Sequence, residues 1–399
     1  MRTEEIDYPL DPACIATAPA EPRDAARMLV LHRAADRIEH RHVRDLPDYL
    51  GEGDSLVLNT TRVAPMRLRG RRRGDGRPVE GLILEFRGTA AAHALIQGAR
   101  RFKAGDVVEL RDGTDALAFV ARDGIGWLLE SVGGAPIADV IERSGWTPLP
   151  PYILEARGGG HGGDGSLGLD EESAGSSATN RAGHAGSPSP EDEQALDARD
   201  REDYQTVYAA MTDRPSCAAP TAGLHFTPEL LSAIGRRGVR RIDVELQVGA
   251  GTFRTVDTPD VASHHMHSER CRLRADAALA LSQVHSGHRL VAVGTTSIRV
   301  LESLPRPLPE PMLAVARGLV AGGRGTEEVH DFSTELFIRP GFEFRWVDAL
   351  MTNFHLPRST LLALVGALVG MDRLKRVYAE AQRLGYRFYS YGDAMLILP

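Results

Sequence analysis

Apolar and polar residues alternate with two different periods in the second half of the chain. From Arg241 to Val248 every second residue is apolar, which predicts a half-buried strand. Just before it, the apolar residues between Leu230 and Ile234 recur at helical spacing. Thr227 is a good N-cap for this helix, and Pro228 fits its first position. A helix followed by a strand is the unit from which α/β sheets are built.

The same combination recurs on both sides of this unit. The segment 23–31 is predicted to be a polar turn leading into a strand, and a second strand is predicted at Ser55–Leu58, with a short connecting segment at 45–50 between them. Further on, the pattern predicts a strand at 289–293, a turn at 294–297 and a helix at 298–304. A second unit follows, with a strand at 344–350, a loop at 351–357 and a helix from the cap Ser359 through Gly370. Two strands about a turn are predicted at 386–397.

The pattern changes between Met66 and Thr147. Short apolar runs alternate with turns, and Asp-Gly, a strong turn signal, occurs at Asp75, Asp112 and Asp123. Strands are predicted at 79–86, 92–96, 107–110, 117–121 and 127–131. We therefore expect a small β-barrel domain at 66–147, inserted into a discontinuous α/β (α+β) catalytic domain formed by 1–65 and 148–399.

A third kind of sequence runs from Gly158 to Asp197. It is dense in Gly, Ser, Asp, Glu and Ala and has almost no large apolar residues. Such a segment cannot bury enough apolar surface to fold by itself, so 158–197 is predicted to be a disordered insertion.

Composition excludes several classes of protein. The chain has 399 residues, 42% of them hydrophobic and 25% charged, as expected for a globular protein with two cores. No apolar run approaches the roughly 20 residues that span a bilayer, and no apolar signal core follows the N-terminus, so no membrane association is expected. The three cysteines form no CxxC pair, which favours a cytoplasmic location.

Charge limits the nature of the partners. The formal charge of -7 argues against a protein that coats nucleic acid non-specifically, but basic residues cluster locally. These clusters lie at Arg62–Arg77, Arg100–Lys103 and Arg236–Arg241, and they leave a local RNA site open. For any single cluster a solvated surface is the simpler interpretation.

Candidate chemistry gathers between Ser216 and Glu269. Small residues dominate Ala218–Gly223 and Gly249–Gly251, and small residues let a ligand approach the backbone. His225, His267 and Glu269 can transfer protons. The glycine loop is not a dinucleotide fingerprint, because Arg254 stands where the third glycine belongs and no helix follows. His264 and His267 lack further clustered ligands, so no metal is expected.

Polar residues at predicted strand ends supply further candidates. Thr295, Thr296 and Ser297 precede a helix whose free N–H groups favour an anion, although one of these hydroxyls could simply cap the helix. Asn59, Thr61 and Arg62 follow a strand, where they form either a ligand site or a polar turn. Asp348 and Asp393 stand beside apolar runs and need partners if they are buried.

Several long motifs in a fixed order resemble the S-adenosylmethionine:tRNA ribosyltransferase-isomerase family of queuosine biosynthesis. The resemblance covers nearly the whole chain apart from the predicted insertion. It is carried by the segments 59–68, 204–208, 218–226, 248–253, 266–269, 293–303, 336–341, 347–362 and 386–397.

The resemblance implies that the ribose of S-adenosylmethionine, rather than its methyl group, is transferred to 7-aminomethyl-7-deazaguanine at the tRNA wobble position. Isomerisation gives epoxyqueuosine, and adenine and methionine are released. The implied partners are S-adenosylmethionine, which is a consumed co-substrate rather than a cofactor, and tRNA; the family needs no metal. The chain is expected to be a monomer.

The resemblance also implies roles for the candidates. His225, His267 and Glu269 would transfer protons, while Thr295, Thr296, Ser297 and Arg299 would hold the methionine carboxylate. Residues expected near the ribose or the substrate base are Asn59, Thr61 and Arg62, and further substrate-binding candidates are Gly249, Gly251, Asp348, Asn353, His355 and Asp393.

The chain departs from the family pattern at Thr60, at 97–100, at Gln247 and at Arg339. These departures leave two alternatives open. One is a related ribosyl transferase that acts on another deazapurine or on a small-molecule amine. The other is a non-catalytic RNA-binding relative.

Overall fold

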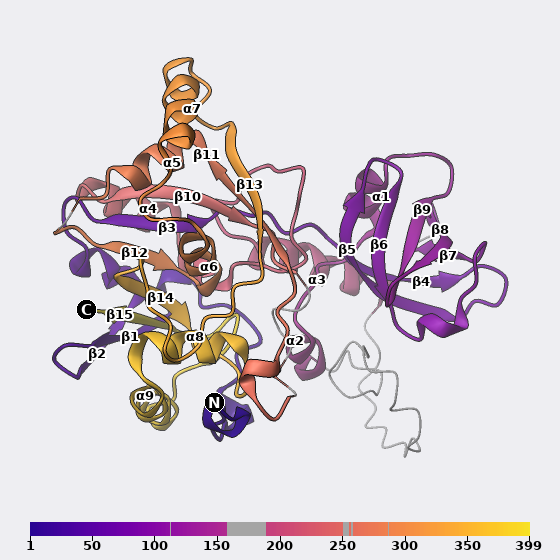
Figure 1. Ribbon diagram of the computed structural model, residues 1–399. Helices are drawn as coiled ribbons and strands as arrows, with labels where there is room; N and C mark the ends of the chain where they lie inside the picture. The colour runs from indigo at the N-terminus through magenta and orange to yellow at the C-terminus, as the bar shows by residue number, and fades with distance from the viewer. Residues whose placement is uncertain (112, 158–188, 250–254, 257, 286) are drawn as a thin grey trace. The chain divides into compact units, whose positions relative to one another are not determined.

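The chain forms two compact units, which are described separately (Figure 1). A computed structural model describes residues 1–111, 113–157, 189–249, 255–256, 258–285 and 287–399. Unit 1 comprises Met1–Arg62, Thr206–Met211 and Ala219–Pro399, and unit 2 comprises Val63–Gln205 and Thr212–Ala218. The fold is the expected one, a mixed sheet with helices in one unit and a closed barrel in the other.

The core of unit 1 is a single sheet in which nine strands are seen among the described residues, in the order β13-β11-β10-β3-β12-β14-β15-β1-β2. The strands are β1 (Arg27–His32), β2 (Arg37–His42), β3 (Ser55–Asn59), β10 (Arg240–Leu246), β11 (Glu269–Arg274), β12 (Leu290–Val293), β13 (Glu328–Thr334), β14 (Ala349–Asn353) and β15 (Ala394–Leu398).

The four middle strands, β10, β3, β12 and β14, are parallel to one another. Every residue of β3, β12 and β14 is buried, as expected for parallel strands covered on both faces. The register pairs Ile242 of β10 with Val57 of β3, and Val57 with Ala292 of β12. Their carboxyl ends therefore meet at one edge of the sheet.

Helices and one long 3-10 segment cover the sheet. The helices are α4 (Pro228–Arg236), α5 (Ala275–Ser282), α6 (Thr295–Ser303), α7 (Glu310–Ala321), α8 (Thr360–Val369) and α9 (Met371–Arg383). The 3-10 segments are η1 (Thr3–Ile6), η2 (Pro12–Cys14), η3 (Arg23–Ala25), η4 (Val43–Tyr49), η6 (Thr221–His225) and η8 (Val261–Ser263).

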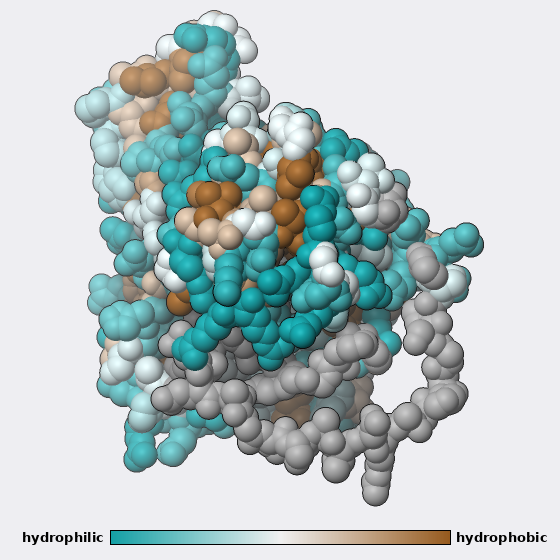
Figure 2. Space-filling model, turned by 90° about the vertical axis from the view of Figure 1, so that its right-hand side faces the viewer, coloured by the Kyte–Doolittle hydropathy of each residue, from teal (hydrophilic) through white to brown (hydrophobic). Residues whose placement is uncertain are grey.

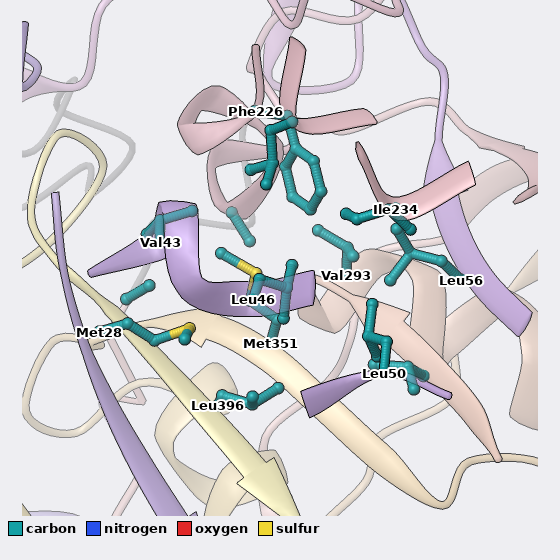
Figure 3. Packing of buried hydrophobic residues seen from close by; sticks show 14 of the residues in the cluster. Met28, Val43, Leu46, Leu50, Leu56, Phe226, Ile234, Val293, Met351 and Leu396 are labelled. Atoms are coloured by element: carbon teal, nitrogen blue, oxygen red, sulfur yellow. The ribbon is translucent and has the colours of Figure 1, made fainter. Parts of the chain in front are cut away.

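One face of the sheet packs against η4, α4 and the residue after η6 (Figure 3). Val293 and Met351 of the middle strands belong to one buried apolar cluster with Leu46 of η4, with Phe226 after η6, and with Ile234 of α4. Burying such side chains contributes roughly 1.5–3 kcal/mol each, so this packing holds the strand ends in place.

Local signals placed several helices correctly. The Thr227 side chain accepts a hydrogen bond from the Leu230 N–H, and Pro228 follows it as the first residue of α4. The Ser359 side chain accepts one from the Leu362 N–H and begins α8. Both helices start where their caps predict.

Three boundaries in unit 1 differ from the predictions. β14 begins at Ala349 rather than Phe344 and continues through Asn353, because pairing with β12 and β15 extends it into the predicted loop. α6 begins at Thr295, so the hydroxyl residues lie in its first turn and not in a turn before it. The C-terminal segment forms one strand, β15, and not two.

Unit 2 contains a closed barrel of six strands within the described residues, in the order β4-β5-β6-β9-β8-β7. They are β4 (Arg67–Arg72), β5 (Pro78–Arg87), β6 (Ala91–Ile96), β7 (Val107–Leu110), β8 (Asp115–Asp123) and β9 (Gly126–Ser131). The turn η5 (Ala99–Arg101) lies between β6 and β7, and helix α1 (Ile137–Ser144) follows the barrel. Phe119 stacks on Phe102 and meets Trp127 edge to face inside it.

The sequence analysis missed β4, whose basic residues indicated a solvated surface. Leu68 is buried, while Arg67 and Arg69 beside it form ion pairs with Glu80 and Glu193. Arginine stems can line a barrel surface while their head groups stay paired, so an arginine-rich strand remains compatible with a closed sheet.

The end of the predicted insertion is also different from expectation. Helices α2 (Pro151–Ala156) and α3 (Pro190–Asp203) belong to unit 2, so the prediction of disorder is wrong for 190–197; residues 158–188 lie outside the described residues. Buried Asp197 on α3 accepts hydrogen bonds from the Thr147 N–H, Arg111 and Arg201. This carboxylate fixes the helix to the segment that leaves the barrel.

Polar side chains dominate the face of the molecule shown in Figure 2, where apolar residues form small separate patches. Among the described residues, none of the helices combines the length and the apolar character needed to cross a bilayer.

Candidate functional site

Most of the predicted site residues come together at the carboxyl edge of the parallel strands in unit 1. Asn59 ends β3, Gly294 follows β12, and Asn353 ends β14. Because β11 runs antiparallel to β10, and β15 runs antiparallel to β14, Glu269 at the start of β11 and Asp393 just before β15 reach the same edge. Open α/β sheets bind ligands at this edge.

Glu269 is the central carboxylate of this edge. It is buried, and Arg299 of α6 donates to its Oε2 from Nη1. The Gly249 N–H donates to Oε1 at 3.0 Å. A buried carboxylate that is paired with a cation and a backbone N–H is held in one orientation.

The other two guanidinium nitrogens of Arg299 also donate to protein acceptors. Nε donates to the Leu336 carbonyl at 3.2 Å and Nη2 to the Thr334 carbonyl at 3.3 Å. Burial lowers the pKa of Arg299 to about 10, so it stays charged at neutral pH. Arg299 was expected to bind a substrate carboxylate, but its guanidinium pairs with Glu269 instead.

His225 is buried at the end of η6, and both ring nitrogens face backbone carbonyls. Nδ1 lies 3.1 Å from the Ala222 oxygen and Nε2 lies 2.9 Å from the Gly392 oxygen. Burial lowers the pKa of His225, although these two carbonyls oppose the shift. A neutral imidazole has one N–H, so the ring donates to one of these carbonyls and lies against the other, between η6 and the C-terminal turn.

Gly223 explains why η6 needs a small residue. A Cβ at this position would stand 1.9 Å from the Tyr208 hydroxyl and 2.9 Å from Thr206 Cγ2. Tyr208 is itself buried against Phe226, so it cannot move aside. The small-residue motif therefore packs η6 closely against Tyr208.

Asn353 and Asp393 complete the frame around η6. Asn353 accepts from the Thr221 hydroxyl at 3.2 Å and donates to the Tyr389 carbonyl at 3.0 Å. Asp393 accepts from the N–H groups of Arg27 and Arg387. These contacts connect η6, the end of β14 and the C-terminal turn.

Asn59 joins the ends of β3 and β10. Its side chain donates to the Leu246 carbonyl and accepts from the Leu246 and Thr61 N–H groups. Thr61 is buried and Arg62 is half-buried, and both follow β3 at the carboxyl edge. Asn59 thus fixes the direction in which the chain leaves the sheet.

The first turn of α6 contains Thr295, Thr296 and Ser297, all of them buried. Gly294, at φ 83°, is the N-cap, and no side chain caps the helix. The left-handed backbone of Gly294 strongly favours glycine. The sequence motif thus places three hydroxyl residues at the positive end of a helix dipole.

His355 follows β14 and is buried with its ring bonded to the Thr352 hydroxyl at 2.8 Å. Its backbone N–H donates to the Tyr378 hydroxyl, and its carbonyl accepts from the Tyr8 hydroxyl. Burial lowers the pKa of His355 to about 3, so the ring is neutral at physiological pH.

Of the predicted residues, Asp348 lies elsewhere. Asp348 precedes β14 at the opposite edge of the sheet, where it accepts from the Leu290 N–H at 2.8 Å and fixes the start of β12. His267 is exposed, two residues before Glu269. Gly251 lies outside the described residues.

The sequence analysis did not single out Thr221, Thr352 or Tyr208. Thr221 lay inside the recognised small-residue motif, and its hydroxyl gave a signal that could have been used. Tyr208 is recognised only through its contacts with Gly223 and Phe226, whereas Thr352 bonds His355 three residues further along the chain. Among the described residues, no group of three or more His, Cys, Asp or Glu side chains is arranged to hold a metal ion.

The fold and the edge cluster define an α/β protein with a second, barrel-forming unit and a paired carboxylate where open sheets bind ligands. The sequence matches the family described as Queuosine biosynthesis protein over residues 3–397, and the chain belongs to that family.

Two relatives match over the full length of both chains. S-adenosylmethionine:tRNA ribosyltransferase-isomerase of Rhizorhabdus wittichii is 40% identical, and the protein of the same name from Symbiobacterium thermophilum is 41% identical, each over 100% of both chains. The crystal structure of S-adenosylmethionine tRNA ribosyltransferase from Thermotoga maritima is 31% identical, covers 99% of this chain and 100% of that one, and has a TM-score of 0.47.

Proposed function

We propose that this protein is an S-adenosylmethionine:tRNA ribosyltransferase-isomerase. It transfers and isomerises the ribosyl group of S-adenosylmethionine onto 7-aminomethyl-7-deazaguanine in the tRNA wobble position, giving epoxyqueuosine, adenine and methionine. The observation that carries the proposal is the full-length match at about 40% identity to relatives with this name. The buried Glu269–Arg299 pair at the carboxyl edge supports it.

The reaction needs groups that move protons. The sulfonium acidifies the ribose C5′ protons, so a base must accept one of them, and adenine leaves more easily when an acid protonates it. We assign the base to Glu269, because Arg299 and the Gly249 N–H hold its carboxylate in one orientation. His267 is the second proton-transfer group in this proposal.

The other edge residues position the site. Arg299 orients Glu269. His225 fixes the position of η6, because its ring lies between the backbone carbonyls of Ala222 and Gly392. Asn59 and Asn353 fix the ends of β3 and β14, between which the nucleoside would bind. Thr61 and Arg62 are proposed to contact the ribose or the substrate base.

The experiment is a product assay. The protein is incubated with S-adenosylmethionine and either tRNA containing 7-aminomethyl-7-deazaguanine or the free deazapurine, and adenine and methionine are measured. We expect both products to be released when the acceptor is the tRNA, and neither when the acceptor is the free deazapurine. Release with the free base would identify the small-molecule transferase, and tRNA binding without release would identify a non-catalytic relative.

A further inference from the structure

The first turn of α6 contains buried hydrogen-bond donors without acceptors. The N–H groups of Thr295, Thr296 and Ser297 have none in the described part of the chain. Thr296 is 7% exposed, and its Oγ1 is buried with no hydrogen-bond partner among the described residues. Buried polar groups are normally paired, so the described residues leave this helix end without the partner that such groups require.

α8 provides the comparison within the same sheet. Thr360 and Leu362 of its first turn are also buried, but there the Ser359 side chain accepts from the Leu362 N–H. α6 has glycine at that position and therefore has no side-chain acceptor. A ligand acceptor can reach the N–H groups where a capping side chain would otherwise stand.

The donors determine which ligand chemistry fits. Ser297 Oγ already donates to the Val293 carbonyl at 2.7 Å, and Arg299 is bound to Glu269 and two carbonyls. Backbone N–H groups, one hydroxyl and the positive end of the dipole remain. These groups suit an anion with two or three oxygens, a carboxylate or a phosphate.

The position favours a ligand of the active edge. Along the chain of unit 1, β3 is followed through α4 by β10 on one side of it, whereas β12 is followed, after α6, α7 and the edge strand β13, by β14 on the other side. Adjacent strands whose connections diverge in this way form the switch point where α/β sheets bind ligands. The first turn of α6 also lies beside η6, since a Cβ on Gly294 would stand 3.6 Å from the Ala222 Cβ and from Thr296 Oγ1.

We infer that the first turn of α6, with Thr296 Oγ1 as its side-chain donor, binds the methionine carboxylate of S-adenosylmethionine. This rests on the proposed function. A carboxylate here lies one helical turn from Arg299, and so from Glu269, which Arg299 holds. A tRNA phosphate has the same chemistry, but the burial of all three residues favours the smaller ligand.

The experiment compares two ligands that differ only in the inferred contact. The dissociation constants of S-adenosylmethionine and of decarboxylated S-adenosylmethionine are measured with the wild type, Thr296→Val and Thr360→Val. Thr360 is the matched control, because it is also 7% exposed and is the first residue of α8.

We expect the wild type to prefer S-adenosylmethionine. Thr296→Val should weaken its binding about tenfold or more while leaving the decarboxylated ligand unchanged, because a hydrogen bond to a charged group is lost. Thr360→Val should bind both ligands as the wild type does, and Thr296→Ser, which keeps the hydroxyl, should retain the preference.

Equal binding of the two ligands by the wild type would overturn the inference without any variant. Equal losses for both ligands in Thr296→Val would overturn it too, since the hydroxyl would then be structural. If Thr296→Val bound both small ligands as the wild type does and lost only affinity for tRNA, measured in parallel, the anion at this site would be a phosphate. That result would contradict the methionine assignment. Failure of the wild type to bind S-adenosylmethionine at all would instead contradict the proposed function.

Discussion

The two ends of the parallel strands each contain a buried carboxylate paired with an arginine. At the amino end, Asp54 precedes β3 and binds Arg289, which precedes β12. At the carboxyl end, Glu269 binds Arg299. The pairs are alike in chemistry, so the type of residue alone does not distinguish a structural ion pair from a functional one.

Their surroundings make the difference. Asp54 also accepts from the N–H groups of Gly51 and Arg289, so it closes the turns that begin two strands. Glu269 accepts from Gly249, and its arginine belongs to the helix whose first-turn N–H groups and Thr296 hydroxyl have no acceptor among the described residues. The comparison teaches that function is indicated by unsatisfied neighbours rather than by the charged pair.

The largest effect is expected from Glu269→Gln. The amide keeps the shape of the side chain but cannot accept a proton, so turnover should fall at least about 100-fold. Adenine release per folded protein measures this. Folding should be checked in parallel, because the change leaves Arg299 buried and unpaired. Turnover near the wild-type value would remove Glu269 from the mechanism.

Asp54→Asn tests the opposite end. Breaking this pair should lower the free energy of unfolding by about 3 kcal/mol, because Arg289 loses its counter-charge. The turnover of the folded variant should equal that of the wild type. Urea titration and the adenine assay together check this expectation. A large loss of turnover in a folded Asp54→Asn protein would mean that the two ends do not differ as described.

Arg299→Lys distinguishes positioning from substrate binding. Lysine keeps the charge but cannot bridge Glu269 and two carbonyls with a planar fork. If Arg299 positions Glu269, kcat should fall about tenfold to a hundredfold with little change in the KM for S-adenosylmethionine. If it holds the substrate carboxylate, KM should rise instead. Steady-state kinetics in S-adenosylmethionine separate the two.

The smallest effect is a pH dependence of stability due to His355. The folded protein has a His355 pKa of about 3, whereas the unfolded chain has one near the ordinary value of about 6.5. Between these values the unfolded chain binds more protons, so stability falls as the pH drops, by at most about 1.4 kcal/mol per pH unit.

His355→Gln should therefore show a shallower decline of the free energy of unfolding between pH 6.5 and pH 5 than the wild type. Urea titrations at several pH values measure both slopes. His265→Gln is the matched control, because that histidine is exposed and its replacement should leave the slope unchanged. Identical slopes in all three proteins would contradict the role given to burial.

Local chemistry explains which parts of the fold were predictable. Thr227 and Ser359 determine where α4 and α8 begin through contacts three residues away, which a sequence reveals directly. The alternation of apolar and polar residues predicted β10, and short apolar runs between turns predicted the barrel strands β5–β9. The extension of β14 to Asn353 depends on pairing with β15, and the anchoring of α3 depends on Asp197 meeting Thr147. Neither partner can be read from the local pattern.

The same limit applies to the site. Residue types and the family resemblance indicated which side chains matter, and the sheet topology brings most of them to one edge. Asp348 fell inside the strand predicted at 344–350, but it precedes β14, which begins at Ala349. The pairing of Arg299 with Glu269 joins residues 30 positions apart, so only the folded chain reveals it.

The sheet of unit 1 is open at both sides, unlike the closed barrel of unit 2. Its outer strands are β2, where Arg37, Glu39 and Arg41 alternate with other residues, and β13, which has exposed Glu328 and Asp331. A charged border is a poor template for strand addition by another chain. We expect this to keep concentrated solutions of the protein free of sheet-type aggregates.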